Sequence, residues 1–102
     1  MTDTDKPGGP LALAASFPPD ERYVPTAADL AAKLAAAAGC GEASAEEVRL
    51  EVDGAFRLAL AGERPAGLSI DVSLRTSAAS FEAELTCGSE RLLHCRRSRS
   101  SA

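Results

Sequence analysis

The sequence has 102 residues, a net charge of −4 and aromatic side chains at only 4% of positions. This length provides one domain with one modest core, and the scarcity of aromatic residues predicts a core of aliphatic and alanine side chains. The acidic balance excludes a nucleic-acid-binding surface over the whole domain, because phosphate recognition requires concentrated positive charge. The sequence contains no run of about 18 apolar residues, so we expect no transmembrane helix and no membrane partner.

The two ends of the chain differ in composition from its middle. The N-terminal stretch MTDTDKPGGP is acidic and rich in Pro and Gly, unlike an export signal. We therefore predict a cytoplasmic protein with a disordered leader at 1–10, a single domain at 11–97 and a disordered tail at 98–102. Arginines gather near the C-terminus, where a solvated tail is favoured over an RNA or membrane contact. They are Arg91, Arg96, Arg97 and Arg99.

The segment LALAASF has apolar residues at every second position, which predicts a first strand. The residues on this apolar face are Leu11, Leu13, Ala15 and Phe17. A helix is expected to open at Pro25 and Thr26, with Thr26 as N-cap and Asp29 three residues later, and to close at Gly39. Its apolar stripe consists of Ala27, Leu30, Ala31, Leu34 and Ala38.

A second helix is predicted from Ser44, which forms a capping box with Glu47, to about Gly62. Its core face consists of Val48, Val52, Ala55, Phe56 and Ala59. Nearly opposite lies a second apolar stripe of Leu50, Gly54, Leu58 and Ala61. We expect this stripe to be covered either by Leu92 and Leu93 of the chain's own tail or by a second polypeptide.

Two later segments alternate strictly between apolar and polar residues, and only Ser77, Ala78 and Ala79 separate them, which predicts an antiparallel hairpin. The inward residues are Leu68, Ile70, Val72 and Leu74, then Phe81, Ala83, Leu85 and Cys87. RLLHC is a candidate third strand of this sheet. The predicted fold is therefore an α+β two-layer sandwich of order β-α-α-β-β-β, with two helices on one face of a mostly antiparallel sheet.

Three cysteines and one histidine raise the question of a metal or catalytic site. Cys40, Cys87, His94 and Cys95 offer four zinc ligands, but their spacing lacks the close pairs typical of structural zinc sites, so we expect no metal and reduced thiols. His94 and Cys95 are also unsuited to act as a nucleophilic pair, because neighbours on a strand point to opposite faces.

The order and residue pattern of most of the chain, from Leu11 to Gly88, resemble the ATP-binding domain of anti-sigma factor serine kinases, a branch of the histidine-kinase-like ATPases. Three segments carry the resemblance: ASFPPDERYVPTAADLAAKLA, GCGEASAEEVRLEVDGAFRLALAG and SIDVSLRTSAASFEAELTCGS. The resemblance implies a Glu-x-x-x-Asn motif on the second helix. In that motif the Glu helps to activate the attacking group, and the Asn helps to hold the magnesium ion bound to the phosphates. The resemblance also implies an Asp-x-Gly box that reads adenine.

This sequence departs from that pattern at each chemical position. Gly54 stands in place of the Glu, Leu58 in place of the Asn and Thr86 in place of the Asp, while Gly88 matches the box. The nearby acids Glu51 and Asp53 are expected to point away from the Gly54/Leu58 face. The sequence also ends at Ala102, fourteen residues after Gly88, without the family's lid and second glycine box. We therefore expect no nucleotide, no other cofactor and no enzymatic activity.

The leading interpretation is a non-catalytic regulatory domain that binds a protein through the stripe of Leu50, Gly54, Leu58 and Ala61. The resemblance implies that the partner is a sigma factor, an antagonist protein or a second copy in a homodimer, in bacterial transcription regulation. Two alternatives stay open: an ATP-dependent serine kinase with divergent residues, and a small α/β domain whose likeness to the family is accidental.

Overall fold

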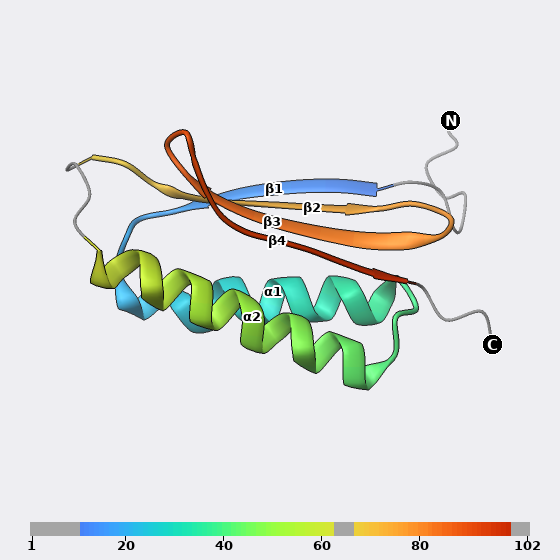
Figure 1. The fold of residues 1–102 in the computed structure, drawn as a ribbon. Coiled ribbons are helices and arrows are strands. Elements are labelled where there is room, and N and C mark those ends of the chain that lie inside the picture. The colour runs from blue at the N-terminus through green and yellow to red at the C-terminus, as the bar shows by residue number, and fades with distance from the viewer. Residues whose placement is uncertain (1–10, 63–66, 99–102) are drawn as a thin grey trace, which may run out of the picture.

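The computed structural model describes residues 11–62 and 67–98, which form a four-stranded antiparallel sheet with two helices packed on one face (Figure 1). The elements in chain order are β1 (Leu11–Phe17), a short 3-10 helix (Glu21–Tyr23), α1 (Val24–Ala37), α2 (Glu42–Ala61), β2 (Ile70–Thr76), β3 (Ser80–Cys87) and β4 (Glu90–Ser98). This confirms the predicted α+β sandwich and its β-α-α-β-β-β order. The predicted leader and residues 99–102 of the predicted tail lie outside the described residues, and β4 continues through Ser98.

The strands lie in the order β1-β2-β3-β4, so β1 and β4 are the two edges of the sheet. Residue 13 pairs with residue 74 and residue 17 with residue 70, which places the predicted apolar face of β1 on the same side as the inward residues of β2. The predicted hairpin of β2 and β3 is confirmed, as is the third strand suggested by RLLHC. The β3–β4 register shifts between Leu85 and Thr86, which leaves Leu92 as an extra residue on β4.

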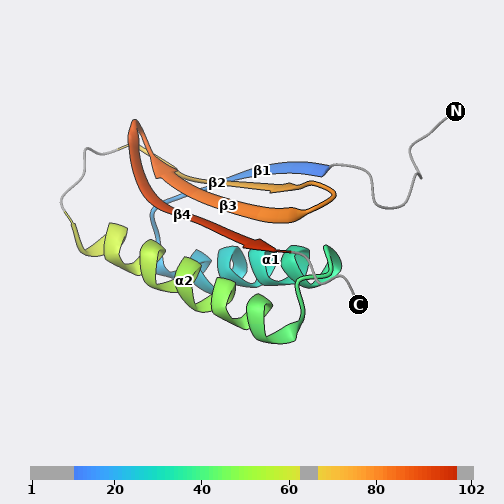
Figure 2. The same ribbon diagram turned by 45° about the vertical axis from the view of Figure 1, so that its right-hand side comes forward.

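The core lies between the sheet and the helices. Its largest fully buried side chains are Phe56, Phe81, Ile70, Leu74, Leu85, Val24, Val48, Val52 and Val72. Helix α2 packs over β3 and β4, and α1 packs over β2. The buried face of α1 is almost entirely alanine, as the composition predicted, and Leu30 and Leu34 lie half-buried at its margin. In both views β1 is drawn farther from the two helices than β4, and Leu11 and Leu13 in its first half are exposed (Figures 1 and 2).

The start of the first helix differs from the prediction. Helix α1 begins at Val24, so the assignment of Thr26 as N-cap was wrong. The chain enters α1 through the 3-10 turn, whose N-cap Asp20 has extended backbone and accepts a hydrogen bond from the Arg22 N–H. A capping side chain acts only where the backbone before the helix is still extended, and at Thr26 the chain is already helical.

The start of the second helix was also predicted too late. Helix α2 begins at Glu42 after Gly41, which has a positive φ of 91°, so Ser44 and Glu47 lie inside the helix and form no capping box. The predicted ends of both helices are confirmed. Gly39 has a φ of 93°, and the N–H groups of Gly39 and Cys40 donate to carbonyls in the last turn of α1, at 3.0 and 3.1 Å. This Schellman arrangement ends α1, and Gly62 ends α2.

Candidate functional site

The second apolar stripe of α2 lies at the surface of the molecule. Leu50 is 63% exposed and Leu58 is 75% exposed, and Gly54 and Ala61 between and beyond them are also exposed. On the opposite side of the same helix, Val48, Val52, Phe56 and Ala59 are buried, and Ala55 is half-buried at the margin. A twenty-residue helix against a sheet buries one face only, so its second apolar face is left to solvent.

The chain does not cover this stripe within the described residues. Leu92 and Leu93, the residues expected to fold across it, lie in β4 and pack half-buried against the core. Leu58 borders a shallow groove of about 430 Å³ between the C-terminal half of α2 and the start of β4. The groove is lined by Ala55, Leu58, Ala59, Ala61, Gly62, Glu90, Arg91 and Leu92. Within residues 11–62 and 67–98, the expected cover by Leu92 and Leu93 is therefore not formed, and the stripe is exposed.

The four positions that match the family's nucleotide motifs do not line one pocket. Gly54 and Leu58 lie one turn apart on the exposed side of α2. Thr86 is on the solvent side of the sheet, opposite Asp71, because the residues before and after it on β3 face the core. Gly88 is in the β3–β4 turn with a φ of 62°, and a Cβ there would lie 3.5 Å from the Leu68 side chain. The positions are thus divided between the two faces of the sheet.

The two acids of α2 next to the stripe are held by arginines. The Arg57 guanidinium donates to Asp53 at 2.8 Å and to Glu21 at 2.9 Å, which links α2 to the 3-10 turn. Glu51 accepts a short hydrogen bond from Arg97 of β4. Arg97 also lies 3.3 Å from Glu47. These contacts join the end of β4 and the 3-10 turn to α2, and they engage both carboxylates.

A surface hollow of about 660 Å³ lies between the outer sides of α1 and α2. Asp29 on its wall accepts a hydrogen bond from Arg49 at 2.8 Å and lies 3.0 Å from Lys33. The hydrogen bonds from Arg49 and then Lys33 lower the pKa of the Asp29 carboxyl from its ordinary value. The pair of Asp29 and Lys33 could be predicted from sequence, because the two residues are one turn apart on the same helix. The contact with Arg49 could not, because Arg49 lies on the other helix. Arg49 also lies 3.2 Å from Glu46, so two carboxylates and two cations compensate one another, as in a structural contact between helices.

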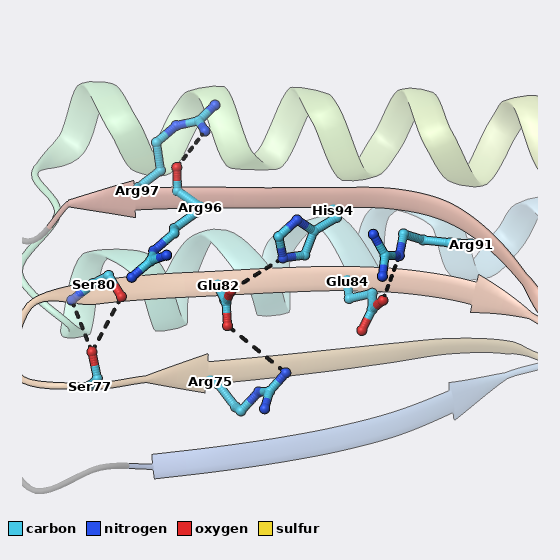
Figure 3. A network of polar contacts seen from close by, with 9 residues as sticks. All are labelled: Arg75, Ser77, Ser80, Glu82, Glu84, Arg91, His94, Arg96 and Arg97. Atoms are coloured by element: carbon cyan, nitrogen blue, oxygen red, sulfur yellow. Dashed lines mark hydrogen bonds and ion pairs between the residues drawn. The ribbon is translucent and has the colours of Figure 1, made fainter.

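On the solvent face of the sheet, ionisable side chains of β2, β3 and β4 make a row of polar contacts (Figure 3). Glu82 of β3 lies 3.9 Å from Arg75 on β2 and 3.2 Å from His94 on β4. Arg91 pairs with Glu84 at 2.8 Å. Opposite charges on neighbouring strands stabilise the sheet modestly, and the polar side chains keep this face exposed to solvent.

The cysteines form no candidate catalytic or metal site in the part of the chain that the structure describes. All three are buried, and no group of three or more potential metal ligands is present among residues 11–62 and 67–98. Cys95 faces the core, whereas His94 beside it faces solvent and contacts Glu82, so the two side chains point apart as predicted. Burial, followed by the nearby Glu51 carboxylate, raises the pKa of the Cys95 thiol to about 11, which keeps it protonated at neutral pH.

Comparisons with protein-family models, curated proteins and solved structures find no match for this chain. Among the described residues, the helices are too short or too polar to cross a membrane. The site must therefore be interpreted from its own geometry. Its most distinctive feature is the exposed stripe of α2 with the adjoining groove, and the ionisable groups beside it are already paired.

Proposed function

We propose that this chain is a non-catalytic protein-interaction domain whose binding surface is the α2 stripe of Leu50, Gly54, Leu58 and Ala61. The observation that carries the proposal is the exposure of two leucines on the side of α2 that faces away from the core. A leucine side chain contributes about 1.5–3 kcal/mol when it passes from water into an apolar contact, so two on one face favour a partner.

The shape of the surface favours a helical partner. The stripe follows the axis of α2 at one-turn spacing, and the groove beside Leu58 continues it toward β4. Gly54 and Ala61 have little or no side chain, and nothing lies within 4 Å of the position that a Cβ on Gly54 would occupy. A partner helix can therefore approach closely and place its own apolar residues between the two leucines.

The resemblance to anti-sigma factor kinases supplies the class of partner that we propose, a bacterial sigma factor or an antagonist protein. The structure places each of the three segments on the kind of element that the resemblance assigns to it: a strand and helix, the second helix, and the strand pair. The division of Gly54, Leu58, Thr86 and Gly88 between opposite faces of the sheet favours a binding role over the alternative of an ATP-dependent kinase.

Titration calorimetry separates the binding role from the kinase alternative. We expect no heat above dilution when Mg-ATP or Mg-ADP is titrated into the full chain. Binding in the micromolar range, abolished by Leu58→Asp, would place the nucleotide at the stripe and contradict the proposal.

Site-specific cross-linking tests the stripe itself. A photoreactive phenylalanine analogue at Ala61 should cross-link one partner protein in bacterial cells that express the full chain, and Leu58→Asp should remove the product. The same analogue at Arg96, exposed on the solvent face of the sheet, is the matched control and should give none of it. A product that survives Leu58→Asp would refute the assignment of the stripe, and a product of twice the chain mass would identify a second copy as the occupant.

A further inference from the structure

The edge strand β1 has the features of a strand that pairs with another chain. It is seven residues long and pairs with β2 on one side only, so within the described residues its other side lacks a neighbouring strand. Every second residue of such a strand directs its N–H and C=O groups outward. Leu11 is 51% exposed and Leu13 is 39% exposed on its helix side, and LALAASF contains no charge and no proline.

The opposite edge of the sheet is protected in the usual ways. Strand β4 contains Arg91, Arg96 and Arg97, and the register shift beside Leu92 disturbs its regular pairing. Arg97 is also engaged with Glu47 and Glu51 of α2. Charges and bulges on an edge strand oppose pairing with further chains, and β1 has neither. Of the two edges of the sheet, β1 is therefore the one to which another strand can add.

We infer that β1 pairs antiparallel with β1 of a second copy, about a two-fold axis at Ala14, to join two four-stranded sheets into one continuous sheet. In this register Leu11 lies opposite Phe17 and Leu13 opposite Ala15, so the apolar residues of both copies stay on the helix side. Pro10 and Pro18 are equally distant from Ala14 in the sequence, and neither has an N–H to extend the ladder further.

The pattern of β1 and its surroundings favours a second copy over an unrelated strand. In this register the exposed leucines of both copies lie on the same side of the joined sheet. The join therefore buries part of the apolar surface that is exposed in a single chain. On the solvent side, Ala12 of one copy lies opposite Ser16 of the other. The neighbouring β2 residues in that row are Arg75 of one copy and Asp71 of the other, three strand spacings apart, so the join sets no like charges against each other.

The area of such a join is small, because one strand pair and four leucines are buried. We therefore expect a concentration-dependent dimer at the weak end of the range for specific interfaces. The dimer leaves the α2 stripe free, so it is independent of the proposed function and the two can fail separately.

Sedimentation velocity on the full chain, over a wide concentration range, tests the join. We expect a monomer–dimer equilibrium that Ala14→Lys weakens at least about tenfold, because two ammonium groups lie directly opposite at the axis. Ala14 is exposed, so the lysine should not disturb the monomer, and circular dichroism checks this. The matched control is Ala36→Lys, the same change at an exposed position of α1, which should leave the equilibrium unaltered.

A charge-pair experiment fixes the position of the axis. Ala14→Glu alone should weaken the dimer like Ala14→Lys, whereas an equal mixture of the two variants should form a heterodimer close to wild-type affinity. A wild-type chain that stays monomeric at the highest concentration, or a mixture no tighter than either variant alone, would overturn the inference. A dimer that Leu58→Asp abolishes and Ala14→Lys leaves intact would assign self-association to the α2 stripe and would equally overturn it.

Discussion

The two faces of α2 present similar side chains to opposite environments. Phe56 is fully buried, whereas Leu58, two residues later, is 75% exposed. Apolar character alone therefore does not decide which residues form the core. What decides is the angle around the helix relative to the sheet, and the apolar residues on the other side are left for a different contact.

The largest effect should come from the buried face. Phe56→Ala removes a ring that lies 6.3 Å from Phe17, centroid to centroid, and leaves a cavity in the core. We expect the free energy of unfolding to fall by about 3–5 kcal/mol, measured by urea denaturation. A loss below about 1 kcal/mol would mean that α2 does not pack on the sheet through this face.

A smaller effect is expected where the two faces of α2 meet. Arg97→Gln removes the contacts to Glu47 and Glu51 that hold β4 to the helix. We expect a loss of about 1 kcal/mol in the free energy of unfolding, reduced by added salt. Arg96→Gln is the matched control, because its side chain is exposed on the other face of the sheet, and it should be neutral. Equal losses in both variants would contradict the assignment.

The exposed face should tolerate a charge. Leu58→Asp is expected to change the free energy of unfolding by no more than about 0.7 kcal/mol, the difference in helix propensity. The same change at Leu60, which is half-buried against the core, should cost more because it brings a carboxylate to an apolar contact. Thermal melts of the two variants measure the contrast. Equal destabilisation would show that Leu58 is covered.

The smallest effect concerns acid stability and the outer contact between the helices. Hydrogen bonds from Arg49 and then Lys33 lower the pKa of Asp29 below its ordinary value of 3.8. A lowered folded-state pKa adds stability that is fully present above the unfolded-state value and is lost as the pH falls through the folded one. Asp29→Asn should therefore differ from wild type by a constant amount at neutral pH, and the difference should shrink below about pH 4. A difference that grows in acid would reverse the assignment.

The elements that depend on local pattern could be predicted from sequence. Strict alternation fixed the inward residues of β2 and β3, and the angular spacing in α2 separated Phe56 from Leu58 correctly. Gly39 marked the end of α1 because its positive φ is a local requirement of the Schellman arrangement.

The features that depend on distant partners could not be predicted. Thr26 and Ser44 have the right side chains for caps, but Asp20 and Gly41 hold the backbone positions where each helical segment begins. The contact of Arg97 with Glu51 joins residues 46 positions apart in the sequence. The exposure of Leu13 follows from the place of β1 at the sheet edge, beyond the reach of the helices, and an alternating pattern does not encode it.

The alanine face of α1 has a consequence for how the domain responds to change. Ala27, Ala28, Ala31 and Ala35 are buried, and an alanine side chain has no rotamer to adjust. A neighbour that grows or shrinks against this helix finds no adjustable side chain on its alanine face, so the adjustment must come from side chains of the sheet or from a shift of α1. A shift of α1 would carry the change to the connections at both ends of the helix.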